Sequence, residues 1–107
     1  MLKVTLEIEK VAAILKLLGD KTRLTMMKML ETDDYCVCDF VEIFKVSQPA
    51  ISQQIRKLKD LGLVEDERKG KWTFYSVNKR SEYFPFIQQI LEQLPNQDDK
   101  GIRISYC

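Results

Sequence analysis

Apolar side chains recur along most of the chain at the spacing of helices, and one central stretch breaks that rhythm. Intervals of three and four residues are typical of an amphipathic helix that buries one face. We expect helices over residues 4–18, 20–31, 38–44, 48–61 and 82–94. Residues 63–68 and 72–77 are instead rich in β-branched and aromatic side chains and flank Lys69-Gly70-Lys71. That pattern predicts a β-hairpin with a basic tip.

The same periodicity predicts which side chains face the core. Asp20 and Ser47 are expected N-caps, and Pro49 suits the first turn of its helix. Gly19 and Gly62 are expected to end the first and fourth helices. The predicted core positions are Val4, Ile8, Val11, Leu15, Leu18, Leu24, Met27, Leu30, Phe40, Val41, Phe44, Ile51, Ile55, Leu58, Phe86, Ile90 and Leu94.

The order of these elements predicts a mainly α fold with a β-hairpin, in the order α-α-α-α-β-β-α. A short turn at Lys45-Val46 joins the third and fourth helices, as a helix-turn-helix requires. A helix-turn-helix followed by a hairpin is a winged helix-turn-helix. We expect one DNA-binding domain over residues 1–95 and a mobile C-terminal tail over residues 96–107.

Charge is concentrated in the middle of the chain. Residues 45–80 carry nine Lys or Arg and four Asp or Glu, a local net charge of +5, although the whole chain carries only +1. A basic centre between acidic ends is typical of a compact nucleic-acid-binding element. No apolar run approaches the roughly 20 residues of a membrane span, and the first residues lack a signal-peptide core. We therefore expect no membrane association and a cytoplasmic location.

The fourth helix is the candidate DNA-reading element. Its face opposite Ile51, Ile55 and Leu58 carries small, amide and cationic side chains. Glutamine and arginine bind adenine and guanine edges, so Gln53 and Arg56 are the predicted base contacts. Trp72, Phe74 and Tyr75 are interpreted as packing residues, with base stacking as the alternative. The full predicted DNA-binding set is Ser47, Gln48, Pro49, Ser52, Gln53, Arg56, Lys57, Lys59, Lys69 and Lys71, with Ser47, Lys57 and Lys59 assigned to phosphate.

Two of the three cysteines, Cys36 and Cys38, precede this helix, and the third, Cys107, is the last residue. The chain has no histidine, so soft thiolates are its distinctive ligands. Positions i and i+2 of a helix point about 200° apart, so the pair can share one ion only at a helix start or in a distorted helix. We predict a site for a thiophilic ion at Cys36, Cys38 and Cys107. Met26, Met27 and Met29 are interpreted as packing residues instead.

Several segments resemble the ArsR/SmtB family of winged-helix metalloregulatory repressors, and its arsenic-responsive branch in particular. The resemblance is carried by Leu18-Gly19-Asp20-Lys21-Thr22-Arg23-Leu24, Cys36-Val37-Cys38-Asp39-Phe40, Ser47-Gln48-Pro49-Ala50-Ile51-Ser52, Leu61-Gly62-Leu63-Val64, Arg68-Lys69-Gly70 and Tyr75. It implies a homodimer that pairs through its first and last helices and binds double-stranded operator DNA. It also implies release of the operator by arsenite or antimonite, without an organic cofactor.

The chain departs from the family pattern at several positions. Glutamine stands at Gln53 and Gln54, where the family often has histidine, which we expect to alter operator preference. The last helix lacks the Asp and His of the family's zinc site, so that site is not expected. Val41 replaces the third cysteine of another arsenic-binding pattern, so a third sulfur must come from elsewhere.

Two alternatives remain open from the sequence. The same DNA-binding repressor could sense cadmium, lead or thiol oxidation. A thiol enzyme or ion carrier without a DNA function is the other, but no Cys/His pair, P-loop or carboxylate constellation supports catalysis.

Overall fold

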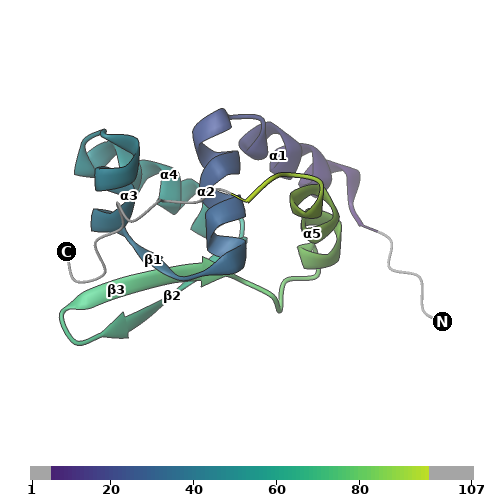
Figure 1. Ribbon diagram of the computed structural model, residues 1–107. Coiled ribbons are helices and arrows are strands. Elements are labelled where there is room, and N and C mark those ends of the chain that lie inside the picture. The colour runs from purple at the N-terminus through teal and green to yellow at the C-terminus, as the bar shows by residue number, and fades with distance from the viewer. Residues whose placement is uncertain (1–5, 97–107) are drawn as a thin grey trace.

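The described part of the chain folds into five helices and a small sheet, with the hairpin projecting from one side (Figure 1). The computed structural model describes residues 6–96. The elements in chain order are α1 (Ile8–Leu18), α2 (Lys21–Thr32), β1 (Tyr35–Cys36), α3 (Val37–Phe44), α4 (Gln48–Asp60), β2 (Val64–Lys69), β3 (Trp72–Val77) and α5 (Phe84–Glu92). This architecture confirms the predicted winged helix-turn-helix. No helix in the described part is long and apolar enough to cross a membrane.

The sheet contains one strand that the sequence did not predict. Strand β3 lies between β1 and β2 and is antiparallel to both. In the register, Tyr35 faces Tyr75 and Cys36 faces Phe74. A strand of two residues is too short to show the alternation by which strands are recognised, which is why it was missed. As a result α3 begins at Val37, one residue earlier than expected.

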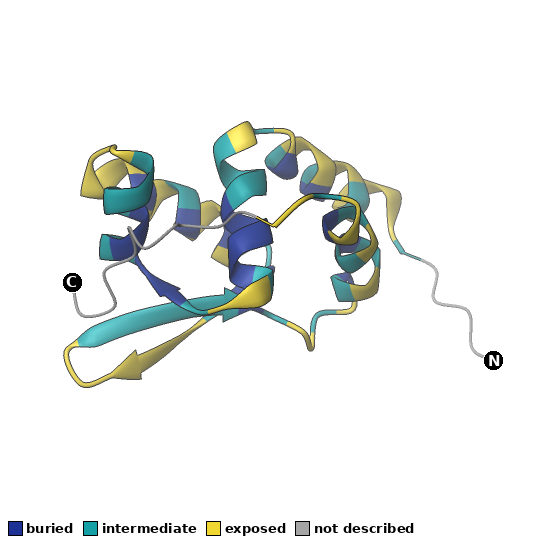
Figure 2. Cartoon of the chain, in the orientation of Figure 1, coloured by how far each residue is buried: buried dark blue, intermediate teal, exposed yellow. Residues whose placement is uncertain are grey.

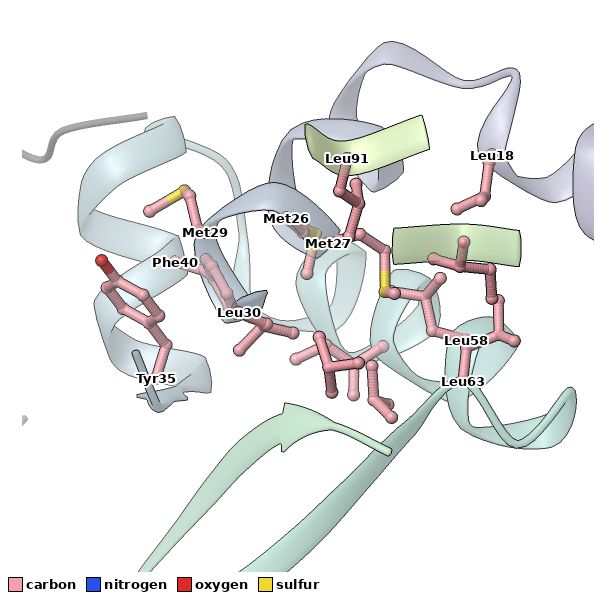
Figure 3. Close-up of a cluster of buried hydrophobic side chains, with 14 of the residues drawn as sticks. Leu18, Met26, Met27, Met29, Leu30, Tyr35, Phe40, Leu58, Leu63 and Leu91 are labelled. Atoms are coloured by element: carbon pink, nitrogen blue, oxygen red, sulfur yellow. The ribbon is translucent and has the colours of Figure 1, made fainter. Parts of the chain in front are cut away.

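The core lies between α2, α4 and the base of the sheet, with α1 and α5 packed at one end (Figures 1 and 3). Met26, Met27 and Met29 are all buried, which confirms that they are packing residues. Met27, Leu30, Phe40 and the α4 stripe are buried as predicted, whereas Leu24, Val41 and Phe44 are only partly buried. Phe40 stacks on Tyr35 at 5.2 Å between ring centroids, which fixes the start of α3 against the core.

The predicted inner face of α1 is only partly correct, because Leu18 is buried and Val11 packs against the core as predicted, but Ile8 and Leu15 do not. Ile8 is 81% exposed and Leu15 is 50% exposed, while Ile14 and Leu18 are buried. Apolar residues occur on both faces of this helix, so periodicity alone did not identify the one that packs against α2 (Figure 2). Val4, the first predicted core residue, lies outside the described residues.

The prediction for α5 is also only partly correct, because Phe86 and Leu94 pack against the core but are not its most buried residues. Its buried side chains are Ile87 and Leu91, whereas Phe86, Ile90 and Leu94 are only partly buried. The helix is also shorter than residues 82–94, although Pro85 lies in its first turn as expected. Helices α1 and α5 therefore each leave an apolar face only partly covered, at the same end of the molecule (Figure 1).

Candidate functional site

The turn before α4 is short and tightly defined. Lys45 ends α3 in the left-handed conformation, with φ of 58° and ψ of 42°, and its N–H donates to the Val41 carbonyl. A left-handed residue at this position reverses the chain sharply. The Ser47 Oγ then accepts a hydrogen bond from the Ala50 N–H at 3.3 Å, so Ser47 is the N-cap of α4 as predicted.

Helix α4 buries one face and presents the other to solvent. Ile51, Ile55 and Leu58 are buried against the core. The exposed residues of the predicted DNA-binding set on this helix are Gln48, Pro49, Ser52, Gln53, Arg56, Lys57 and Lys59. Side chains on this face are free of the core and are of the types that contact base edges and phosphates.

Gln54 differs from Gln53 in its surroundings. It is partly buried, and its Oε1 accepts a hydrogen bond from the Arg23 guanidinium at 2.5 Å. Gln54 thus points toward α2, whereas its neighbour Gln53 is exposed.

The hairpin formed by β2, β3 and residues 69–71, hereafter the wing, places its basic tip in solvent. Lys69 and Lys71 are both exposed on either side of Gly70, whose φ is 64°. The Lys69 ammonium lies 4.0 Å from the Asp34 carboxylate and 5.4 Å from the Phe74 ring centroid. The aromatic side chains of β3 are partly buried, in keeping with their interpretation as packing residues.

Lys59 is held by an acid of the wing. Its Nζ lies 2.6 Å from Asp66 Oδ2. This hydrogen bond and the Asp66 charge raise the pKa of Lys59, which keeps the ammonium charged. Lys59 therefore has an internal partner that a DNA phosphate would have to replace.

A hollow separates α4 from the wing. It measures about 690 Å³ and is lined by Ser52, Ile55, Arg56, Lys59, Asp60 and Tyr75. Two cationic side chains of the predicted DNA-binding set, Arg56 and Lys59, therefore border one concave surface between α4 and the wing.

The two described cysteines lie on either side of the first residue of α3. Cys36 is the N-cap residue and is buried, at 3% exposure, whereas Cys38 lies in the first turn and is partly buried. The Cys36 N–H donates to Asp39 Oδ2 at 3.1 Å, and Asp39 is itself fully buried. The pair is therefore at a helix start, the arrangement in which residues i and i+2 can both turn toward one ion.

The third predicted ligand, Cys107, lies outside the described residues. Within residues 6–96, no group of three or more His, Cys, Asp or Glu side chains is arranged to hold a metal ion. Cys36 and Cys38 are two residues apart at the start of α3, and a trigonal sulfur site needs a further donor.

The sequence reasoning missed Asp39 and Arg23. The spacing of Asp39 from Cys36 is that of a capping box, in which the residue three positions into a helix accepts from the N-cap backbone. That spacing was a usable signal. Arg23 joins partners remote in sequence, and no local pattern marks it.

The chain is similar in sequence and in fold to known proteins. Residues 20–66 match the family described as bacterial regulatory protein, arsR family. An uncharacterised HTH-type transcriptional regulator of Methanocaldococcus jannaschii is 41% identical over 70 residues, which span 64% of this chain and 79% of that protein. An arsenical resistance operon repressor of Staphylococcus xylosus is 33% identical over 93 residues, 87% of this chain and 86% of that protein. The solved structure of NolR from Sinorhizobium fredii has a TM-score of 0.68 at 25% identity, covering 87% of this chain and 95% of NolR.

The matched segment contains both the cysteine pair and the helix-turn-helix. The similar proteins include transcriptional regulators, which removes the thiol-enzyme alternative. On its sequence, its fold and its exposed recognition helix, the chain belongs to the arsR family of bacterial regulatory proteins and is a DNA-binding transcriptional regulator, not an enzyme.

Proposed function

We propose that the chain is a cytoplasmic homodimeric repressor that binds operator DNA and is released when trivalent arsenic or antimony binds its cysteine thiolates. One observation carries this proposal: the cysteine pair begins α3, the helix that leads through a short turn into α4. A ligand bound there would directly shift α3 and the turn that position the DNA-reading helix α4. The S. xylosus relative, an arsenical resistance operon repressor, supports the same class of inducer.

For DNA recognition, we propose that α4 enters the major groove. Gln53 and Arg56 contact base edges, where each good bidentate pair contributes about 1–3 kcal/mol of discrimination. The remaining cations of α4 and the wing contact phosphates. The concave surface between α4 and the wing supports this assignment, because Arg56 and Lys59 border it together.

The assignment of base and phosphate contacts is tested by comparing Arg56→Ala with Lys57→Ala on a panel of duplexes. Arg56→Ala is expected to weaken binding to the preferred sequence and to relax specificity at one position. Lys57→Ala is expected to weaken binding to all sequences and to reduce the slope of log K against log salt concentration by about 0.9. Equal losses on every sequence for Arg56→Ala would contradict its role as a base reader.

For dimerisation, we propose that two copies pair through α1 and α5. The exposed Ile8 and Leu15 of α1 support this, because large apolar side chains exposed together on a protein surface mark interaction sites. On α5, Phe86 and Ile90 border a surface hollow of about 460 Å³. A second copy of the chain would cover both apolar faces at the same end of the molecule.

For the inducer, we propose Cys36, Cys38 and Cys107 as ligands. Trivalent arsenic and antimony prefer sulfur, usually three in a pyramid, and thiolates suit soft ions of this kind. Drawing Cys36 and Cys38 toward one ion changes the N-cap of α3, where the Cys36 N–H is bonded to Asp39. Cys36 also pairs with Phe74 in β3, so a displacement of Cys36 also acts on the wing.

The inducer site is tested by operator binding with and without arsenite in Cys36→Ser, Cys38→Ser and Cys107→Ser. All three variants are expected to bind operator normally, and the first two to lose their response to arsenite. An unchanged response in the first two refutes the site, whereas an unchanged response in Cys107→Ser removes only that ligand. If Cys107→Ser abolishes the response, adding Val41→Cys supplies a sulfur one turn beyond Cys38 and should restore it.

The same operator-binding assay distinguishes arsenite from the alternative inducers, which are cadmium, lead and thiol oxidation. Cadmium and lead are added in place of arsenite, and a response to either ion at a lower concentration than to arsenite reassigns the inducer. Thiol oxidation is distinguished by release of operator when an oxidant such as a peroxide is added without any ion, and by reversal of that release with a reductant.

A further inference from the structure

Arg23, in the first turn of α2, joins two helices that have no direct sequence connection. Its Nε donates to the Leu17 carbonyl in the last turn of α1 at 2.7 Å. Its Nη1 donates to Gln54 Oε1 in the middle of α4 at 2.5 Å. The Arg23 backbone N–H is itself fixed by the Asp20 carboxylate, which caps α2. One guanidinium therefore links α1, α2 and α4.

Gln54 is placed to receive this bond and not to read DNA. It lies three residues after Ile51 and one before Ile55, which at about 100° per residue sets it at the border of the buried stripe. It is partly buried, whereas Gln53 and Arg56 on the opposite side are exposed. The amide oxygen of Gln54 is thus directed at α2 while its neighbours face outward.

This contact differs in kind from the packing around it. Helices α2 and α4 otherwise contribute apolar side chains such as Met26 and Ile51 to one core, and apolar contacts of this kind tolerate small rotations. A guanidinium presents its donors in a rigid, planar fork, so two bonds to fixed acceptors define an orientation. Lysine has a single ammonium on a flexible stem and cannot reproduce both bonds with the same geometry.

We propose that Arg23 and Gln54 are positioning residues that set the rotation of α4 relative to α1, so that operator recognition depends on them although neither touches DNA. This inference rests on the proposed reading of DNA by the exposed face of α4. A rotation of α4 by about 20° moves a side chain at a radius of about 6 Å by about 2 Å, enough to break a bidentate hydrogen bond. If α1 also lies at the dimer interface, the same link sets the spacing of the two recognition helices, which must match half-sites about 34 Å apart.

The test uses a duplex selected in vitro by the wild-type protein and a scrambled duplex of equal length, with affinities measured by fluorescence anisotropy. Gln54→Met keeps the size of the side chain and removes the acceptor. It is expected to weaken binding to the selected duplex about tenfold, the lower end of what a hydrogen bond to a charged group contributes. Binding to the scrambled duplex should not change. Gln54→Glu keeps an acceptor and should retain affinity within about threefold.

A double-variant cycle tests whether Arg23 and Gln54 act through the same hydrogen bond. Arg23→Lys alone should weaken binding to the selected duplex by a similar factor, and the double variant Arg23→Lys/Gln54→Met should be no weaker than the weaker single variant. Independent, multiplying losses overturn the proposal. So does an equal loss on both duplexes, because a purely structural role lowers the folded fraction and affects all DNA alike.

Gln53→Met is the matched control, since it changes the same side chain type one position away on the exposed face. If Gln53→Met weakens selective binding and Gln54→Met does not, the positioning role is refuted and the DNA-reading role of α4 stands. If neither variant affects selective binding, the positioning role is refuted, and Arg56→Ala decides whether α4 reads DNA. If no duplex can be selected, the proposed reading of DNA by α4 fails and this inference fails with it.

Discussion

Lys28 is a buried lysine whose replacement by methionine tests how α5 is held to the rest of the fold. Its Nζ donates to the Leu91 carbonyl at 2.9 Å, near the C-terminus of α5, and to Glu31 Oε1 at 2.7 Å. The side chains of Lys28 and Glu31 are 7% and 17% exposed. The ammonium thus satisfies a carbonyl at the negative end of a helix and a carboxylate with little access to water.

Lys28→Met keeps the length of the side chain but removes the donor and the charge. Breaking a fully buried pair costs about 3–5 kcal/mol. Because Glu31 retains some exposure and can recover water, and because methionine adds apolar packing, we expect a net loss of about 2–3 kcal/mol. For a domain of this size that corresponds to a fall in Tm of about 10–20 °C.

Equilibrium unfolding in urea, followed by circular dichroism, measures this loss. All variants are compared at one protein concentration, because the proposed dimerisation would make stability concentration-dependent. The double variant Lys28→Met/Glu31→Leu removes the orphaned carboxylate and should recover at least half of the loss. A single variant within about 0.5 kcal/mol of the wild type would refute the reasoning, as would a double variant less stable than Lys28→Met.

Three further changes test other parts of the structure. Ser47→Ala removes the N-cap of α4 and should lower the unfolding free energy by about 1 kcal/mol, whereas a change below 0.3 kcal/mol (about the error of such a measurement) would mean that the cap is not stabilising. Asp66→Asn releases Lys59 from its internal partner and should tighten binding to non-specific DNA at low salt. It should also steepen the slope of log K against log salt concentration by up to about 0.9, and an unchanged slope would show that Lys59 does not reach phosphate. Leu15→Glu and Ile8→Glu place charges on the exposed face of α1 and should shift the sedimentation profile from dimer toward monomer, and a persistent dimer would place the interface elsewhere.

The parts of the fold marked by local chemistry were predictable from the sequence. Ser47, Pro49 and Gly62 delimit α4, and the basic tripeptide between two β-rich runs marks the wing. These signals depend only on residues close together in the sequence, so they can be recognised without knowledge of the tertiary structure.

The rest depends on contacts between distant segments. Strand β1 exists only because β3 pairs with it. The Arg23–Gln54 bond spans 31 residues and the Lys28–Leu91 bond spans 63. For α1, both faces carry apolar residues, and only the packing of α2 decides that Ile14 is buried and Leu15 is not. Of the candidate site, the exposed face of α4 and the placement of the cysteine pair at a helix start followed from local pattern, whereas their linkage through β3 did not.

The acids that face the lysines proposed to contact DNA bear on how such a regulator would find its operator in a genome. Asp66 holds Lys59, and Asp34 lies at the edge of ion-pairing distance from Lys69, so two of the cations are partly neutralised before any DNA is met. Both pairs are largely exposed and therefore weak enough to exchange for a phosphate when the fit is good. A poorly fitting sequence gains less from that exchange, which shortens the time spent on the roughly 10⁶–10⁹ competing sites of a genome. Carboxylates that pair with these lysines would therefore weaken non-specific DNA binding and speed the search for the operator.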